Sequence, residues 1–510
     1  MTSRAPDLPI VERAAAHADR TAIVARDGRF TYRELLAASH AVATALLEGK
    51  NDLGEARVAY LVPPSFHWVA TQWGIWRAGG VAVPLAVSHP PPELEYAIVD
   101  SGALAVVAHP ELAERVEPIA RRHGTRLLVW PAAPDHAAGT LPSVATERRA
   151  QIFYTSGTTG KPKGAVLTHA NLAAQVQSLV AAWEWSAEDC VLGVLPLHHV
   201  HGVVNVLTCA LWSGATCELM PRFDAGEAWR RLMAGGVTLF MAVPTIYARL
   251  IAAWERAAPE DQARMSDACG GLRLMVSGSA ALPVGVLDRW RDISGHTLLE
   301  RYGMTEIGMA LSNPVRGPRT AGHVGTPLPG VEVRLVDDGG REVAPGTPGE
   351  IEVRGPMVFR EYLGQPEATR QAFHDGWFRT GDMAVVEPGG YRVLGRKSVD
   401  IIKTGGYKVS ALEIEEVLRE HPDVQECAVV GVDDPEWGER VCVALVPRAG
   451  CRIETDRIQQ WSRERLAAYK VPSRFLIVNE LPRNPLGKVL KPNLVARFRE
   501  TGSGKRGNMM

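Results

Sequence analysis

Short apolar runs alternate with helix-patterned segments along the first half of this chain. Seven runs are expected to be buried strands, at 58–62, 81–85, 103–108, 127–130, 192–196, 237–243 and 272–276. Residues 31–46, 67–77 and 171–183 are expected to be helices, and Thr31 and Glu34 have the capping-box spacing that begins a helix. Strands that alternate with helices favour βαβ units and a mostly parallel sheet. The first half is therefore predicted to be an α/β body whose ligands bind where strands end.

The pattern changes after residue 330 and again after residue 395. Residues 331–336 and 351–354 alternate in polarity, and Asp338-Gly339 is a hairpin signal, so an antiparallel, barrel-like unit is expected. Residues 396–510 mix strands with a helix that Ser410 and Glu413 would begin as a second capping box. The prediction is an α/β protein. A large N-terminal domain at 1–395 holds two βαβ-type subdomains and the barrel-like β subdomain, and a small mobile α+β domain fills 396–510.

A glycine- and hydroxyl-rich loop follows the apolar pair Ile152-Phe153. Glycines allow close backbone approach, hydroxyls and free N–H groups form an anion-binding concavity, and two lysines add positive charge. A Walker A loop is excluded, because Pro162 stands where its second glycine belongs. The loop is predicted to bind the phosphates of ATP through Thr155, Ser156, Gly157, Thr158, Thr159, Gly160, Lys161, Pro162 and Lys163.

Composition limits the classes of molecule that the protein is expected to bind. The formal net charge is -1, which gives no support for nucleic-acid or membrane-surface binding. Seven scattered cysteines include no C-x-x-C pair, so a zinc site or disulfide framework is not indicated. Reduced thiols and the lack of a signal-like N-terminus favour a cytoplasmic protein with small-molecule partners. The sequence sets no oligomeric state.

Six motifs in order resemble the adenylate-forming superfamily of acyl-CoA synthetases, luciferases and peptide-synthetase adenylation domains. They are residues 155–164, 195–202, 300–306, 377–382, 395–396 with 403–407, and 482–488. The resemblance covers essentially the whole chain. It implies two steps, in which a carboxylate attacks the α-phosphate of ATP and the thiol of CoA, the co-substrate, then displaces AMP.

The resemblance also implies roles in nucleotide binding. Tyr302 would stack on adenine, Asp382 would accept the ribose hydroxyls, and Arg396 would assist it. Lys488 would bind ATP and act as a catalytic residue that bridges the substrate carboxylate and the α-phosphate. Its contact is expected to be worth several kcal/mol, roughly 10²- to 10³-fold in the first step.

A magnesium ion is implied with ATP. Glu306 and Thr158 would be its protein ligands, and Thr305 and Glu306 are placed among the catalytic residues. One carboxylate together with phosphate oxygens is the usual magnesium arrangement.

CoA would bind at Gly405, Gly406 and Tyr407 after the small domain rotates between the two steps. Many relatives place Asp or Lys at the hinge two residues after the arginine, where this chain has Ser398. The spacing to the glycine pair is one residue longer here, so the hinge is expected at Ser398 or Val399.

Within the superfamily, the likeness is to the malonyl-CoA synthetase branch. Residues 195–202, 274–283, 299–309 and 400–409 carry it. A dicarboxylate keeps a second negative charge, and burying it requires a cation nearby. Arg301 is the predicted cation, with Ser279 and His201 as hydrogen-bond partners in the substrate site. For His198 and His199 the sequence favours two roles equally, gating the pocket and packing.

The expected function is a ligase that converts malonate, or methylmalonate as well, with ATP and CoA to malonyl-CoA, AMP and pyrophosphate, a reaction of fatty acid metabolism. Three alternatives stay open. One is an acyl-CoA synthetase for a monocarboxylic fatty or aryl acid, in which Arg301 pairs with Glu300. The second is an adenylating enzyme that loads a separate carrier protein. The third is a non-catalytic nucleotide or acyl-CoA binder, against which Lys488, Glu306 and Asp382 argue together.

Overall fold

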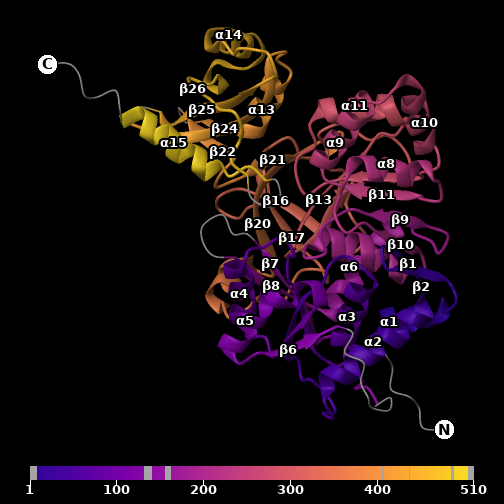
Figure 1. Ribbon diagram of the computed structural model, residues 1–510. Coiled ribbons are helices and arrows are strands. Elements are labelled where there is room, and N and C mark those ends of the chain that lie inside the picture. The colour runs from indigo at the N-terminus through magenta and orange to yellow at the C-terminus, as the bar shows by residue number, and fades with distance from the viewer. Residues whose placement is uncertain are drawn as a thin grey trace.

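The computed structural model describes residues 8–130, 140–155, 162–404, 407–435, 437–483 and 488–503. A large body carries three sheets, and a small body, orange to yellow in Figure 1, sits at one end of it. The chain passes between the two bodies at residues 397–400, after the strand β21. The predicted α/β architecture with a small C-terminal unit is confirmed.

The first sheet has seven strands in the order β18-β8-β7-β4-β3-β5-β6. Its strands are β3 (Arg57–Leu61), β4 (Val81–Pro84), β5 (Ala105–Ala108), β6 (Arg126–Val129), β7 (Arg149–Thr155), β8 (Lys163–Thr168) and β18 (Glu361–Tyr362). The strands β7, β4, β3, β5 and β6 run parallel, as predicted. The strand β8 returns antiparallel to β7 and pairs Lys163 with Thr155. The ends of the predicted phosphate loop therefore meet at this sheet.

Four helices and a short 3₁₀ turn belong with these strands, namely α3 (Phe66–Arg77), α4 (Pro91–Asp100), η1 (Pro110–Leu112), α5 (Ala113–His123) and α6 (His169–Ala182). The tryptophans of α3 (Trp68, Trp73 and Trp76) are all buried, so they serve packing, as predicted. Thr168 and Asn171 form a reciprocal cap at the start of α6.

The second sheet has nine strands in the order β15-β14-β13-β12-β11-β9-β10-β1-β2. They are β1 (Thr21–Ala25), β2 (Gly28–Thr31), β9 (Cys190–Gly193), β10 (Thr216–Leu219), β11 (Leu239–Ala242), β12 (Leu274–Ser277), β13 (Leu299–Met304), β14 (Gly308–Ser312) and β15 (Thr326–Pro327). The strand predicted at 192–196 begins and ends earlier, as β9. Parallel pairing aligns the carboxyl ends of β11, β12 and β13, which lead into the predicted site residues.

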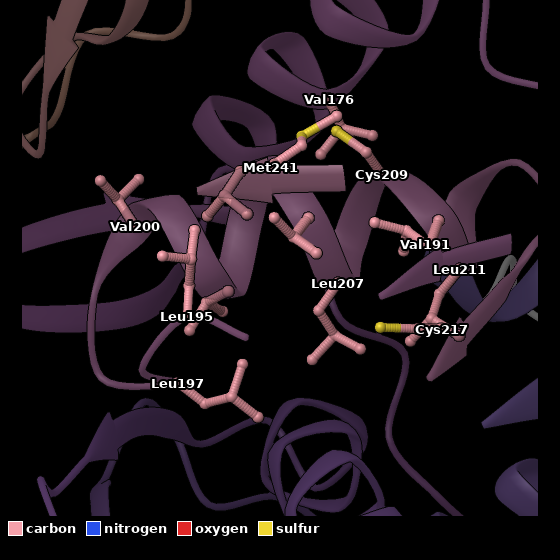
Figure 2. Packing of buried hydrophobic residues seen from close by; sticks show 14 of the residues in the cluster. Val176, Val191, Leu195, Leu197, Val200, Leu207, Cys209, Leu211, Cys217 and Met241 are labelled. Atoms are coloured by element: carbon pink, nitrogen blue, oxygen red, sulfur yellow. The ribbon is translucent and has the colours of Figure 1, made fainter. Parts of the chain in front are cut away.

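The helices around this sheet are α1 (Pro9–Ala16), α2 (Tyr32–Leu47), α7 (Cys209–Trp212), α8 (Ala225–Met233), α9 (Pro244–Glu255), α10 (Pro259–Cys269) and α11 (Val284–Ser294). A π-helix, η2 (His201–Thr208), precedes α7 and is buried along its whole length. Figure 2 shows its Leu207 among aliphatic side chains and the thiols of Cys209 and Cys217. The sulfur atoms thus fill the apolar core.

An antiparallel sheet follows. It consists of β16 (Glu332–Val336), β17 (Gly349–Arg354), β19 (Phe373–His374), β20 (Trp377–Glu387) and β21 (Gly390–Arg396), and α12 (Pro366–Gln371) precedes β19. Asp337 accepts backbone hydrogen bonds from Gly339 and Arg341, so the turn predicted at Asp338-Gly339 is present.

The small body is α+β, as predicted. Its elements are β22 (Ile401–Thr404), β23 (Tyr407–Ser410), α13 (Ala411–Arg419), β24 (Val424–Asp434), β25 (Gly438–Pro447), α14 (Thr455–Arg465), η3 (Ala468–Lys470), β26 (Arg474–Ile477) and α15 (Lys491–Ser503). Apolar side chains of α13 and α14 pack on one face of its sheet, and α15 covers the other. Ser410 caps Glu413 N–H, but the box is half-formed because Glu413 binds Lys470 at 2.6 Å instead. None of the described helices has the length and apolar character that crossing a bilayer requires.

Candidate active site

Three of the predicted nucleotide residues meet where β13, β20 and β21 lie together. The Tyr302 hydroxyl donates to Asp382 Oδ2 at 2.6 Å. Arg396 Nε lies 2.9 Å from Asp382 Oδ1 and its Nη2 donates to Oδ2 at 3.2 Å. Burial lowers the pKa of Arg396, but Asp382, Tyr302 and Glu306 outweigh it and raise the pKa overall. Asp382 is therefore a carboxylate clamped by a permanent cation.

Glu306 lies in the tight turn after β13, next to Thr305. The residue is 4% exposed, and its carboxylate accepts a hydrogen bond from the Tyr362 hydroxyl at 2.9 Å. Burial raises the pKa of Glu306, and no described lysine or arginine pairs with it. Such a carboxylate suits a hard cation that takes its remaining ligands from phosphates and water.

The ends of the phosphate loop lie beside Glu306. Lys163 Nζ stands 5.0 Å from the centre of the Tyr362 ring, whose hydroxyl binds Glu306. The Tyr96 hydroxyl donates to the Pro162 carbonyl at 2.7 Å. Sequence reasoning missed Tyr96 and Tyr362, because no motif marks either position. The predictions for Ser156, Gly157, Thr158, Thr159, Gly160 and Lys161 lie outside the described residues.

The predicted acid-binding residues also come together. Arg301 Nη2 donates to Ser279 Oγ at 3.5 Å, and Ser279 Oγ lies 3.1 Å from His201 Nδ1. Arg301 is 4% exposed, its Nε has no hydrogen-bond partner, and no described carboxylate forms an ion pair with it. Gly278 makes room for it, because a Cβ there would lie 2.4 Å from Arg301 Cζ.

Burial sets the charge of this pocket. It lowers the pKa of Arg301 from 12.5 to about 9, so the guanidinium is still a cation at neutral pH. Burial, and then the charge of Arg301, lower the pKa of His201 well below its usual value, so the imidazole is neutral. The pocket therefore carries one positive charge that no described carboxylate balances. A single additional carboxylate would neutralise it.

Arg301 does not pair with Glu300, the partner that the monocarboxylate alternative required. Glu300 Oε1 accepts a hydrogen bond from the Gly322 N–H at 3.0 Å, since neighbouring residues of β13 point to opposite faces of the sheet. Burial raises the pKa of Glu300 to about 8. The two adjacent residues thus occupy separate environments.

His198 and His199 border the same region. Both are mostly buried, with ring centres 4.1 Å apart, and His198 meets His89 edge to face at 5.6 Å. Burial lowers the pKa of His198 to about 2 and that of His199 to about 4, so both rings are neutral. Their Nε2 atoms have no hydrogen-bond partner, which leaves both packing and gating open to them.

The residues predicted for the second step lie on the small body. Tyr407 is 53% exposed and its ring stacks on Tyr469, with centres 4.1 Å apart. Lys488, which is predicted to act in the first step, is also on the small body and is exposed on the segment before α15. Gly405 and Gly406 lie outside the described residues.

Known proteins share this architecture. The family model of the AMP-binding enzymes matches residues 10–363, and that of the AMP-binding enzyme C-terminal domain matches residues 413–488. The mitochondrial malonate–CoA ligase ACSF3 of Mus musculus is 48% identical over 97% of this chain and 91% of its own length. ATP-bound MatB from Rhodopseudomonas palustris superimposes with a TM-score of 0.89 at 34% identity, over 97% of this chain and 100% of its own. Apo MatB gives 0.78 at the same identity and coverage, so this structure agrees better with the ATP-bound form.

Proposed function

The chain belongs to the family of AMP-binding enzymes, and we propose that it is an ATP-dependent ligase that joins malonate to coenzyme A. The observation that carries the choice of acid is the buried, unpaired Arg301. Malonate would leave one carboxylate charged after the other is activated, and that charge matches the single positive charge of the pocket. A monocarboxylic acid would bury Arg301 uncompensated, which is costly.

In the first step, a malonate oxygen attacks the α-phosphorus of ATP. A carbon-bound oxygen becomes linked to phosphorus, the bond to the bridging oxygen breaks, and pyrophosphate leaves. Because an anion must approach a polyanion, positioning and charge neutralisation supply most of the catalysis. Arg301 and Ser279 hold the distal carboxylate, and Asp382, aligned by Arg396, receives the ribose hydroxyls. Lys488 joins the reacting carboxylate and the α-phosphate.

In the second step, the CoA sulfur attacks the acyl carbon of malonyl-adenylate. A carbon–sulfur bond forms, the carbon–oxygen bond to AMP breaks, and the thiol proton is released. The small body brings its other face to the site for this step, with Gly405, Gly406 and Tyr407 toward CoA. A carrier-protein thiol would react in the same way, so supplying CoA alone separates this alternative from the ligase.

We also propose that Mg²⁺ accompanies ATP. Glu306 would hold it, and Thr158 is its second proposed ligand. When bound, the ion would neutralise phosphate charge. Among the described residues no cluster of three or more His, Cys, Asp or Glu could hold a metal by itself, which fits an ion whose other ligands are phosphates and water.

We place the reaction in the cytoplasm and in fatty acid metabolism. The cysteines are free thiols, and six of the seven are at least partly buried, so a reducing compartment suits them. Methylmalonate, which has the same two carboxylates, is the proposed secondary substrate.

The test is pyrophosphate release with malonate, methylmalonate, succinate, acetate and a long-chain fatty acid, each with and without CoA. Malonate should give the highest kcat/KM, and CoA should be needed for continued turnover. A higher kcat/KM for acetate or a fatty acid than for malonate would refute the choice of acid.

A further inference from the structure

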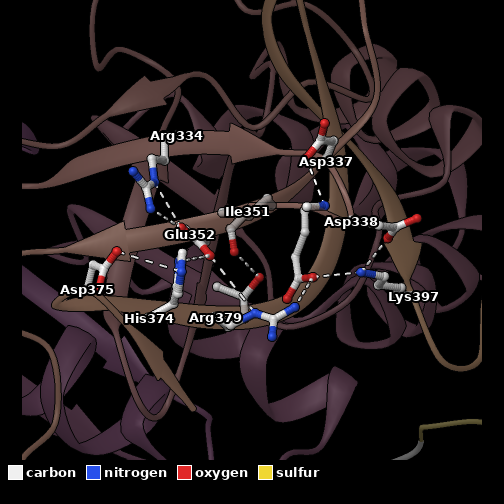
Figure 3. A network of polar contacts seen from close by, with 12 residues as sticks. Arg334, Asp337, Asp338, Ile351, Glu352, His374, Asp375, Arg379 and Lys397 are labelled. Carbon is white, nitrogen blue, oxygen red and sulfur yellow. Dashed lines mark hydrogen bonds and ion pairs between the residues drawn. The ribbon is translucent and has the colours of Figure 1, made fainter. Parts of the chain in front are cut away.

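The segment between β21 and β22 is held from both sides. On the large body, the Lys397 N–H donates to the Gly381 carbonyl at 2.8 Å. Lys397 Nζ lies 2.9 Å from both Glu350 Oε2 and Asp338 Oδ1. Figure 3 shows this lysine at the edge of an ion network that spans the antiparallel sheet. Lys397 therefore belongs to the large body.

Three residues later the chain is fixed to the small body. The Asp400 carbonyl accepts the Ala411 N–H, the first of α13, at 2.7 Å. Asp400 Oδ1 lies 2.6 Å from Lys491 Nζ, which also lies 2.8 Å from Glu415 Oε1. Lys491 is 8% exposed, and although burial lowers its pKa, the two carboxylates outweigh burial and raise it.

Asp400 also reaches back toward the nucleotide site. Its Oδ2 accepts the Arg396 N–H at 3.0 Å, and its own N–H donates to the Arg396 carbonyl at 2.7 Å. The turn is tight, since a Cβ on Gly395 would lie 2.5 Å from that of Asp400. A connected series of contacts thus runs from Asp382 through Arg396 and Asp400 to Lys491. Only Ser398 and Val399 lie between the two anchors.

Helix stability does not explain the position of Lys491. It is the first residue of α15, where the helix dipole disfavours a cation. A buried lysine between two carboxylates is also a weak source of stability compared with apolar packing. The arrangement does fix one geometric relation, because Lys491 follows Lys488 by three residues of described chain.

We propose that Lys491 is a positioning residue, whose bond to Asp400 makes the hinge turn and the Lys488 segment move as one body. This inference rests on the proposed two-step function. Rotation at Ser398 and Val399 then carries Lys488 into the nucleotide site in a set orientation. Without the bond, the small body still rotates, but Lys488 arrives misplaced.

The main variant is Lys491→Met, assayed separately in the two half-reactions. Malonate-dependent exchange of pyrophosphate into ATP reports the first step, which needs Lys488. We expect its rate to fall by about tenfold or more, since small misplacements at a reacting centre cost up to about 10²-fold. Thioester formation from supplied malonyl-adenylate should change by less than about threefold, because it does not use Lys488. Lys491→Arg, which keeps the charge, should restore most of the exchange rate.

Asp400→Asn removes the charge of the other partner in the Asp400–Lys491 ion pair. It provides the same test if Lys491→Met does not fold. It should give the same selective loss, and the double variant should be no slower in exchange than the slower single variant. Additive losses in the double variant would show that the two residues act independently and would overturn the proposal.

The matched control is Ile458→Ala, which leaves a cavity in the core cluster where α13 and α14 pack on the sheet of the small body. Its loss of stability should be similar to that of breaking a buried ion pair. If Lys491→Met slows both half-reactions equally, as expected of Ile458→Ala, its role is structural and the proposal is wrong. If the wild type exchanges with another acid but not with malonate, the malonate assignment fails instead, and the same comparison with that acid decides the role of Lys491.

Discussion

The sharpest prediction concerns Arg301. Arg301→Met replaces a buried cation with an apolar side chain of similar length. In the protein without substrate, Arg301 has one long hydrogen bond to Ser279 and an unpaired Nε. Its removal therefore takes away a desolvated charge rather than an ion pair. Replacing buried charged groups with apolar ones is often neutral or stabilising by roughly 1–4 kcal/mol. The free protein should be as stable as the wild type, or more stable.

When malonate is bound, the same substitution is expected to be unfavourable. Losing one partner of a buried, hydrogen-bonded charge pair costs about 2–5 kcal/mol, because the other charge is left unpaired. At about 1.4 kcal/mol per tenfold, kcat/KM for malonate should fall by roughly 30- to 5,000-fold. The KM for ATP should stay near that of the wild type, since Arg301 contacts neither Asp382 nor Arg396 in the described structure. Activity and stability are thus expected to move in opposite directions.

Thermal unfolding and pyrophosphate release, measured on the same samples, test this reasoning. Arg319→Met is the matched control, because Arg319 is a part-buried arginine whose nitrogens donate to three backbone carbonyls, those of Pro314, Thr297 and Val315. That variant should lose stability with no selective loss of malonate turnover. Arg301→Met that is less stable than the wild type, or that still turns malonate over at a near wild-type rate, would refute the argument.

Three further predictions follow from the same site. Lys488→Ala should abolish malonate-dependent pyrophosphate exchange while thioester formation from supplied malonyl-adenylate survives; equal impairment in single-turnover assays would contradict its role in the first step. Tyr362→Phe removes a hydrogen bond that lowers the pKa of Glu306, so this pKa should rise further. The acid limb of the pH–rate profile should therefore move to higher pH. An unchanged limb would show that Glu306 does not limit the rate there. Burial raises the pKa of Glu300 to about 8, against about 4.3 unfolded, so stability is fully present below the lower value and is lost as pH rises through the upper one. Glu300→Gln should flatten the fall in the thermal midpoint between about pH 4.5 and pH 8, and a fall as steep as in the wild type would count against the raised pKa.

The large elements were predictable because local signals and packing agree there. Thr31 and Glu34 do form the reciprocal capping box that begins α2. The identical spacing at Ser410 and Glu413 forms only half of one, because Lys470 arrives from about sixty residues away and binds the glutamate. A contact between residues far apart in the sequence cannot be predicted from the four residues of a capping-box pattern. The π-helix at His201–Thr208 was also beyond prediction, since its apolar pattern does not distinguish it from an ordinary buried helix.

In the candidate site, too, some residues were predictable from motifs and others depend on contacts between distant segments. Arg301, Ser279 and His201 come from three separate motifs, and the structure brings them within hydrogen-bond reach of one another. Tyr362 lies in no motif, yet it bridges Lys163 and Glu306, because β18 pairs with β8 at the edge of the first sheet. Sequence motifs identify the candidate ligand-binding residues. The residues that orient them depend on which strands become neighbours.

Two buried residues of opposite charge lie close together on one short segment of the candidate site. Arg301 and Glu306 lie five residues apart, on β13 and the turn after it, and both are 4% exposed. Burial lowers the pKa of Arg301 and raises the pKa of Glu306, so in both cases it favours the neutral form. Neither residue has an ion-pair partner among the described residues. They do not neutralise each other, because Arg301 turns to Ser279 and Glu306 to Tyr362. Among the described residues, Arg301 thus has no counter-ion and suits a carboxylate, whereas Glu306 feels the charge of Arg396 without pairing with it and suits a cation that accompanies phosphates. In the proposed function, substrates that supply both would gain the electrostatic stabilisation that the described residues do not provide.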